Sequence, residues 1–336
     1  EKELSELCDK FRKNNGEFDV LVPGSGGKDS IFVAHQLKHK YKMNPLLCSW
    51  SPTMITEIGK KNLKAWIDIG FEIEFNKVNK ELHRILTKLS FLNLCHPFQP
   101  FIIGQKNFAP KVAKKRNIQL VMFGEHDAEF GSDLERWDKP SMNINRFTHD
   151  KINYDEIFLG GVQLNEILKK YNFTIDDIGD YLPIETEVFN ANKIEFHYYS
   201  YYKKWNFHDN YYYAINNSKF LPENERIQGS YDKYSSTDDK IDYLHFYTYY
   251  IKFGMGRATA ATEQEIRAGV INRDEGVSLV KRFDSEFPSK YYKDFLDYMQ
   301  INDKEFSEVI DRSRPDHLWK KIGNNWELKK PIWESD

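Results

Sequence analysis

The stretch Pro23-Gly24-Ser25-Gly26-Gly27-Lys28-Asp29-Ser30 constrains the fold of this chain more than any other. It follows the apolar run 19–22 and precedes the helix-compatible run 31–34. This order predicts a strand, a phosphate-binding loop and a helix. Glycines permit a tight turn and let backbone N–H groups approach an anion, and the positive end of the helix dipole faces the same point. We therefore expect residues 23–30 to bind the phosphates of a nucleotide.

The side chains of this loop suit a polyphosphate and make Lys28 and Asp29 candidate catalytic residues. Lys28 adds a mobile positive charge, Ser25 and Ser30 add hydroxyl donors, and Asp29 can hold a divalent cation against phosphate oxygens. The spacing differs from the Walker A motif and from the dinucleotide-binding Gly-x-Gly-x-x-Gly. The alternative interpretation is a glycine-rich turn before a helix cap.

Strands alternate with helices in the first part of the chain. After the loop helix, which should end near Tyr41, we expect strands at residues 45–50, 71–75 and 119–123 and helices at residues 56–69, 81–94 and 105–116. This order predicts an α/β fold with a doubly wound parallel sheet, in a domain that spans residues 1–130. Residues 131–336 are expected to form a mainly helical substrate or partner region, with an aromatic strand insertion at residues 194–202.

Ligands of such a sheet bind beyond the carboxyl ends of its strands. The rule brings the loop 23–30 together with Ser49 and Trp50, at the end of the second strand, and with Gly124, after the fourth. We therefore expect these three residues to complete the nucleotide site.

An acidic stretch follows Gly124 and offers metal ligands. Mg²⁺ usually takes one or two protein carboxylates, so Glu125 could complete a magnesium site with Asp29, and Glu129 is the second candidate. The alternative is a solvated acidic loop.

Further polar candidates lie outside the loop. Lys233 and Arg257 lie in segments that could close over a pyrophosphate and neutralise its charge, with a helix stop and surface charges as the alternative. His96 could be a base or a substrate contact, although a structural histidine beside two prolines is the simpler interpretation. We expect His96, Gln105 and Lys106 to bind the second substrate.

Tyrosines crowd residues 198–202 and 211–213. Their faces could stack on a sugar, or they could serve packing or a subunit interface such as that of a homodimer.

The composition restricts the setting of any reaction. The 48 Lys+Arg nearly balance the 51 Asp+Glu, so no strong electrostatic field attracts the protein to nucleic acid or to a membrane. No signal peptide is visible, and no run approaches the roughly 18 apolar residues of a membrane span. Cys8, Cys48 and Cys95 are widely spaced without metal-ligand spacing, which indicates reduced thiols. We expect a cytoplasmic protein that binds neither nucleic acid nor membrane.

The loop Ser-Gly-Gly-x-Asp-Ser resembles the PP-loop of the N-type ATP pyrophosphatases, which have a HUP-like fold and cleave ATP between its α- and β-phosphates. Further strings narrow the resemblance: residues 96–98, 104–108, 233–236 with 238–242, 252–259 and 282–288. Over essentially the whole chain they look like the N-acetyl sugar amidotransferases of bacterial surface-glycan pathways, the PseA/WbpG type.

This resemblance implies an enzyme that uses ATP and Mg²⁺ to convert a sugar acetamido group into an acetamidino group, in pseudaminic-acid or lipopolysaccharide O-antigen biosynthesis. The acetamido oxygen would attack the α-phosphate of ATP and release pyrophosphate, and ammonia would then displace AMP from the O-adenylyl imidate. No Cys–His–Glu triad is apparent, so ammonia must come from solution or from a partner glutaminase. Relatives usually carry a four-cysteine zinc-ribbon-like segment ahead of the position where this sequence begins, so any zinc role falls outside residues 1–336.

Two other functions stay open at this point. A tRNA-modifying PP-loop enzyme, either a thiolase or a lysidine-type ligase, would need a basic RNA surface, and thiolases generally need reactive cysteines. A non-enzymatic ATP-binding scaffold in a glycan complex would release no AMP or pyrophosphate with an N-acetyl sugar.

Overall fold

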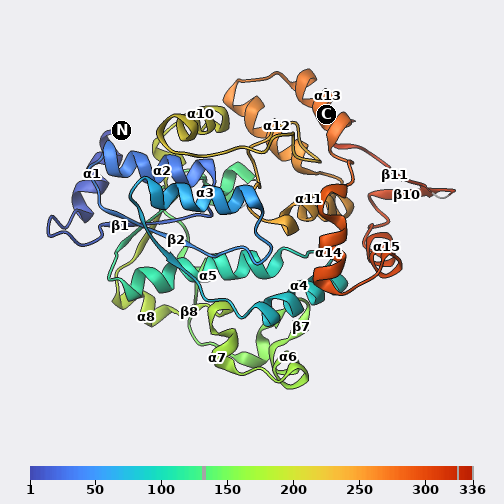
Figure 1. The fold of residues 1–336 in the computed structure, drawn as a ribbon, viewed down its shortest axis with the longest axis horizontal. Coiled ribbons are helices and arrows are strands. Elements are labelled where there is room, and N and C mark those ends of the chain that lie inside the picture. The colour runs from blue at the N-terminus through green and yellow to red at the C-terminus, as the bar shows by residue number, and fades with distance from the viewer. Residues whose placement is uncertain (131–133, 324, 335–336) are drawn as a thin grey trace.

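The computed structural model describes residues 1–130, 134–323 and 325–334, and its centre is a five-stranded parallel sheet (Figure 1). In spatial order the strands are β3 (Glu72–Phe75), β2 (Pro45–Ser49), β1 (Val20–Pro23), β4 (Leu120–Phe123) and β9 (Glu195–Tyr198). Every neighbouring pair is parallel. The strand order reverses between β1 and β4, so a ligand crevice is expected where the chain leaves these two strands.

Helices make up most of the remaining structure. In chain order they are α1 (Lys2–Phe11), α2 (Lys28–His39), α3 (Glu57–Asp68), α4 (Lys80–Leu94), α5 (Gln99–Lys115), α6 (Leu164–Tyr171), α7 (Ile175–Ile178), α8 (Thr186–Ala191), α9 (Tyr199–Tyr202), α10 (Phe207–Asn217), α11 (Lys240–Phe253), α12 (Arg257–Ala268), α13 (Arg273–Phe283), α14 (Tyr292–Met299) and α15 (Asp303–Arg312). The short paired strands are β5 (Thr148–His149) with β8 (Ile184–Glu185), β6 (Phe158–Leu159) with β7 (Val162–Gln163), and β10 (Trp319–Ile322) with β11 (Asn325–Leu328).

The central strands are apolar on both faces because helices cover both (Figure 1). Leu21, Leu46 and Val121 belong to a buried cluster with residues of α4 and α5. Val20 and Val22 point the other way, into a cluster with residues of α1, α2, α3 and α10. Successive strand residues face opposite sides, so both sets are needed to bury a parallel sheet. The predicted α/β class and parallel sheet are confirmed, and the helices on both faces are consistent with the doubly wound arrangement.

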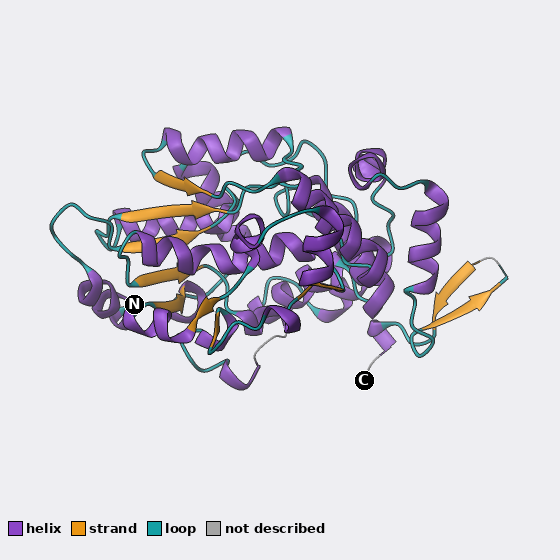
Figure 2. Cartoon of the chain, turned by 90° about the horizontal axis from the view of Figure 1, so that it is seen from below, coloured by secondary structure: helices purple, strands orange, loops and turns teal. Residues whose placement is uncertain are grey.

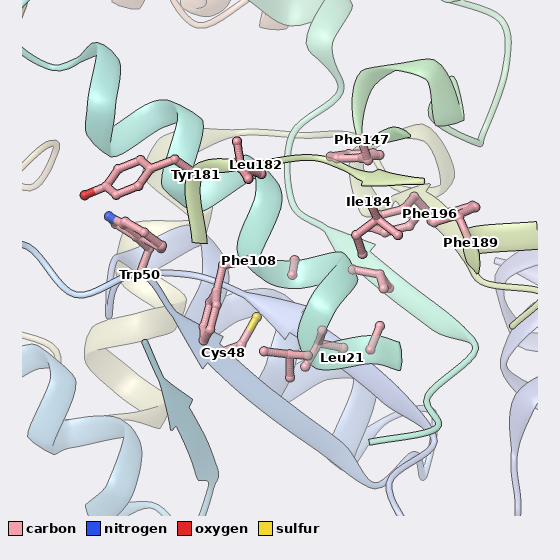
Figure 3. Packing of buried hydrophobic residues seen from close by; sticks show 14 of the residues in the cluster. Leu21, Cys48, Trp50, Phe108, Phe147, Tyr181, Leu182, Ile184, Phe189 and Phe196 are labelled. Atoms are coloured by element: carbon pink, nitrogen blue, oxygen red, sulfur yellow. The ribbon is translucent and has the colours of Figure 1, made fainter. Parts of the chain in front are cut away.

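Aromatic side chains extend the core on the α5 side of the sheet (Figure 3). The indole of Trp50 packs edge-on against Tyr181 and Phe108, with ring centroids 5.3 and 6.1 Å away. A Cβ on Gly104 would lie 2.2 Å from the Trp50 ring, so α5 can rest on the indole only because a glycine stands there. Further along the same core, Phe147 stacks on Phe196 of β9 at 4.5 Å.

Two predicted boundaries are wrong. The helix expected from residue 105 begins at Gln99, because Pro100 falls in the first turn, where a missing N–H costs nothing. The aromatic strand expected at residues 194–202 is β9 alone, after which the chain turns into α9. Moreover, β9 pairs with β4 in the main sheet and is not an insertion in a separate region.

The second half of the chain is mainly helical, as the sequence predicts. Figure 2 shows the strands of the main sheet gathered at one end of the molecule and the β10–β11 hairpin projecting at the other, where Figure 1 places α14 and α15. The proposed division at residue 130 adjoins residues 131–133, which lie outside the described residues, and it stays a prediction. Across the described chain, no helix has both the length and the apolar character needed to cross a membrane.

Candidate active site

The glycine-rich loop leaves β1 at the point where the strand order reverses. The N–H of Gly24 donates to the carbonyl of Cys48 at 2.9 Å, which ties the loop to β2. A Cβ on Gly24 would lie 2.3 Å from the Cβ of Ser30, and Gly26 has a φ of +92°. The backbone therefore turns as only glycines allow. Gly27 is the N-cap of α2 and provides no side-chain cap, so the N-terminal N–H groups of α2 can bind an anion.

Lys28 and Asp29 lie at the start of α2 and face each other. Lys28 is buried, with 3% of its surface exposed, and its ammonium pairs with the Asp29 carboxylate. The ammonium lies 4.3 Å from the ring centroid of Phe207, and Asn210 donates to Asp29 Oδ1 at 2.8 Å. Both partners come from α10, and no feature of the sequence predicts that this helix lies over the loop. The loop and α10 thus hold the charged pair from two sides.

Glu125 follows β4 and lies near Asp29. Desolvation and then the negative charge of Asp29 raise the pKa of Glu125 to about 8, although Lys28 opposes both effects. Glu129 lies farther along, where its carboxylate and its carbonyl both contact the Arg267 guanidinium, at 3.3 and 2.7 Å. Because the Asp29 charge disfavours ionisation of Glu125, the carboxyl groups of Asp29 and Glu125 fit a magnesium ion, which would remove this repulsion.

Among the described residues, no three His, Cys, Asp or Glu side chains are arranged to hold a metal ion on their own. Asp29 and Glu125 form a set of two oxygen ligands, so phosphate oxygens and water would have to supply the remaining positions.

The other residues expected around the nucleotide, which are Gly124, Ser49 and Trp50, differ in which of their groups lie at the strand ends. Gly124 lies against Trp205, because a Cβ there would lie 3.2 Å from the indole, and its carbonyl accepts from the Ser200 N–H at 2.9 Å. The Ser49 hydroxyl is buried, and the described residues give it no hydrogen-bond partner. The side chain of Trp50 packs in the core described above, so only its backbone lies at the strand end. Ser49 and Gly124 thus lie at the carboxyl ends of β2 and β4, whereas the Trp50 indole belongs to the core.

Residues 232–242, here called the covering segment, lie over the glycine loop. The Asp238 carboxyl interacts with the Ser25 hydroxyl, and desolvation and then Asp242 raise its pKa to about 6. The Thr56 N–H donates to the carbonyl of Asp238 at 2.9 Å, which fastens this segment to the start of α3. Arg257, at the start of α12, donates to the Ser236 hydroxyl at 2.5 Å. The structure thus brings the expected Arg257 and the loop into one region.

Arg257 is held firmly in place. Its guanidinium lies 3.9 Å from Asp242 Oδ2 and 4.2 Å from the ring centroid of Phe246. Asp284, which lies beyond α12 in the sequence, caps this helix: its carboxylate accepts from the N–H groups of Gly256 and Thr259 at 2.7 and 2.9 Å. A carboxylate at this helix start replaces the missing N-cap side chain and fixes the first residue of the helix.

The remaining predicted contacts are spread more widely. Lys233 is exposed, and its ammonium has no hydrogen-bond or ion-pair partner among the described residues. His96 stacks on His245 at 4.9 Å, and burial lowers the pKa of His96 to about 3, so the ring is neutral. Arg257 also lowers the pKa of His245, which places the histidine pair near that guanidinium. Gln105 is half-buried on α5, and Lys106 is exposed beside Arg146.

Comparisons with known proteins address the second half of the chain. Residues 228–332 match the family model described as "LPS biosynthesis protein WbpG-like, C-terminal domain". A 45-residue segment is 40% identical to the "Uncharacterized protein MJ1599" of Methanocaldococcus jannaschii; it spans 13% of this chain and 16% of that protein. The matched family region contains Asp238 and Arg257, which lie over or near the loop, and also the exposed Lys233. The second half of this chain is therefore similar to the C-terminal domain of WbpG-like lipopolysaccharide-biosynthesis proteins.

Proposed function

We propose that the protein is an ATP-dependent, AMP-forming amidotransferase that converts the acetamido group of an N-acetyl sugar into an acetamidino group in surface-glycan biosynthesis. One observation carries the proposal: a glycine loop with a buried Lys28–Asp29 pair faces a segment that belongs to the WbpG-like match. The loop resembles a PP-loop, which grips pyrophosphate and leaves the α-phosphorus open to attack.

Each candidate residue would act mainly through its charge. The N–H groups at the start of α2 and the Lys28 ammonium would bind the pyrophosphate as it departs. Asp29 and Glu125 would hold Mg²⁺, whose charge neutralises phosphate oxygens. Arg257 would add a positive charge from the start of α12, and its contacts with Ser236 and Phe246 keep it oriented. Positioning and charge neutralisation therefore supply most of the catalysis.

The neutral His96–His245 pair gives the second substrate a site of suitable chemistry. Its stacked imidazoles and the Phe98 ring, whose centroid lies 5.3 Å from that of His245, form an aromatic group against which a sugar ring would pack. Because burial keeps both imidazoles uncharged near neutral pH, they would donate or accept single hydrogen bonds to hydroxyl or acetamido groups.

Ammonia would come from a partner glutaminase or from solution. Cys8, Cys48 and Cys95 are all buried free thiols, and desolvation raises the pKa of each of them. A thiol with a raised pKa is a poor nucleophile. The same observation argues against a tRNA thiolase, which needs a reactive cysteine.

The reaction can be tested directly. The protein is incubated with Mg²⁺, ATP, ammonium chloride and a panel of free and nucleotide-linked N-acetyl sugars, and nucleotide products are separated. We expect AMP, pyrophosphate and amidine in equal amounts with at least one sugar. A sugar whose acetamido oxygen is labelled with heavy oxygen should give labelled AMP and an unlabelled amidine. ADP as the dominant product, or label in inorganic phosphate, would contradict adenylation.

A further inference from the structure

The side chains of Tyr234, His208 and Glu265 form a hydrogen-bonded chain beside Lys28, and the reaction proposed above assigns them no role. The Tyr234 hydroxyl lies 2.9 Å from Nδ1 of His208, and Nε2 of His208 lies 2.9 Å from Oε1 of Glu265. The ring centroid of Tyr234 is 5.4 Å from the Lys28 ammonium, so the chain ends at the glycine loop. Glu265 is buried, whereas 37% of the His208 side chain is exposed.

Three separate parts of the fold hold this chain in place. His208 is in the first turn of α10, where the Asn206 side chain accepts its N–H at 2.9 Å. Tyr234 belongs to the covering segment, and its ring stacks on Tyr211 of α10 at 4.3 Å. Glu265 comes from α12, whose first residue is the Arg257 described above. A chain fixed from three elements is preorganised, because little side-chain freedom remains to be lost.

The charges around His208 favour a proton on its ring. The hydrogen bond that His208 makes to Glu265 raises the pKa of His208 above its ordinary value, and the charges of Glu265 and Asp232 raise it further, whereas desolvation and Lys28 lower it. The imidazole therefore binds a proton more tightly than an unperturbed histidine does. A hydroxyl, an imidazole and a carboxylate in this order form an arrangement in which the ring takes a proton and the carboxylate stabilises the resulting imidazolium.

We propose that His208 is the proton acceptor in the adenylation step, that the Tyr234 hydroxyl passes the proton to it, and that Glu265 is the positioning residue of the imidazole. The inference rests on the proposed function and adds to it a base that the charged loop does not provide.

In the adenylation step, each bond that forms is matched by a bond that breaks. The π pair of the acetamido C=O bond forms the new bond from that oxygen to the α-phosphorus, and the bond from the phosphorus to the departing pyrophosphate breaks with its electron pair. The acetamido N–H bond also breaks, and its electron pair forms the C=N bond of the imidate, so the carbon keeps four bonds. The Tyr234 oxygen takes this proton while its own passes to Nδ1 of His208. The exposed His208 ring later releases the proton to solvent, and ammonia then displaces AMP without further need of a base.

Exchange of labelled pyrophosphate into ATP tests this step alone, because the assay runs with sugar and without ammonia. His208→Gln retains an N–H for Glu265 but cannot accept a proton, and we expect exchange to fall at least about 10²-fold with an unchanged KM for ATP. Tyr234→Phe, which keeps the stacking on Tyr211, should fall similarly. His149→Gln alters an exposed histidine outside the site and should leave exchange unchanged.

The pH profile separates a proton acceptor from a structural residue. Wild-type exchange should rise with pH as His208 loses its proton, and His208→Gln should lose this limb. Glu265→Gln should move the limb to lower pH, because its carboxylate is what raises the pKa of His208. A limb that persists in His208→Gln, or exchange at the wild-type rate in a folded variant, would overturn the assignment.

The two proposals can fail separately. A wild-type protein that forms no AMP with any N-acetyl sugar and ammonia would remove the proposed function. A wild-type protein that forms AMP, with variants that match it, would remove only the proton acceptor. Titration of the His208 ring by NMR in labelled wild type and Glu265→Gln needs no activity, and an unshifted pKa there would show that the carboxylate does not tune the imidazole.

Discussion

At the scale of single residues, a side chain from the distant helix α10 holds the charged pair of the glycine loop. The glycines at positions 24 and 26 and the Lys28–Asp29 pair occupy the places that the strand–loop–helix pattern predicts. Asn210, which holds Asp29, lies far along the chain in an ordinary amphipathic helix. Nothing in its local sequence distinguishes it from a surface asparagine, because the contact arises only when α10 packs on α2.

Replacement of the charged pair should stop the reaction with little effect on the fold. We expect Lys28→Ala and Asp29→Asn each to lower AMP formation at least about 10²-fold, the usual loss when one preorganised electrostatic contact is removed. Lys38→Ala serves as the control, since Lys38 is in the same helix and its ammonium bonds the Gly70 carbonyl at 2.8 Å. Steady-state rates and circular dichroism check both points. Full activity in either variant would exclude the loop from the chemistry.

Glu125→Gln should separate metal affinity from stability. The substitution removes a carboxyl that Asp29 repels, so the free protein should keep or gain resistance to heat. The Mg²⁺ concentration that gives half-maximal rate should rise several-fold, because one oxygen ligand has lost its charge. Glu129→Gln, whose carboxylate contacts Arg267, should require no additional Mg²⁺. If Glu129→Gln shows the higher requirement instead, the magnesium ligand has been assigned to the wrong residue.

At the scale of elements, periodicity predicted strands and helices better than their ends. The alternation over residues 19–123 gave the four strands β1 to β4 in the right order. The start of α5 was missed because Pro100 looks like a helix breaker and is harmless in a first turn. The place of β9 was missed because a strand's sequence carries its pattern of burial but not the identity of its neighbour.

The start of α11 should make stability depend on pH. Asp239 caps this helix and is buried, and desolvation raises its pKa to about 8. Because Asp239 binds a proton more tightly in the folded than in the unfolded state, the proton stabilises the fold. This stabilisation is complete below the ordinary pKa of 3.8 and is lost as pH rises toward 8. Asp239→Asn keeps an equally good cap but does not titrate.

Urea unfolding midpoints of both proteins between pH 5 and pH 8.5 test this. As pH rises across this range, the free energy of unfolding of Asp239→Asn should increase relative to that of the wild type by at least about 1.4 kcal/mol, which corresponds to one pKa unit. Parallel curves for the two proteins would mean that Asp239 is ionised in the folded state throughout.

At the scale of the whole molecule, the candidate site is assembled from segments far apart in the sequence. The loop after β1, the turn after β4, α10, the segment before α11 and the start of α12 all contribute a side chain. A single sequence can name the chemistry of each segment, and the rule for parallel sheets predicts where the first two meet. It cannot predict that the later segments fold back over them, since that depends on tertiary packing.

Binding of pyrophosphate with Mg²⁺ should therefore stabilise both halves of the chain together. At about 100 times the dissociation constant, ligand binding adds about 2.7 kcal/mol, which should raise the melting temperature by several degrees. Hydrogen exchange should slow at residues 24–30 and also at residues 232–242. Lys28→Ala should lose the shift. Protection confined to residues 24–30 would show that the covering segment makes no contact with the ligand.

The pairing of β9 with β4 also bears on how the protein is made. As the chain leaves the ribosome, β4 emerges before its neighbour, and residues 124–194 must follow before the edge of the sheet is closed. At about 5–20 residues per second, that edge stays open for several seconds. An unpaired edge strand of apolar residues is a template for pairing with other chains. Expression of residues 1–130 alone should accordingly give aggregates, and a fragment that continues through β9 should stay dispersed.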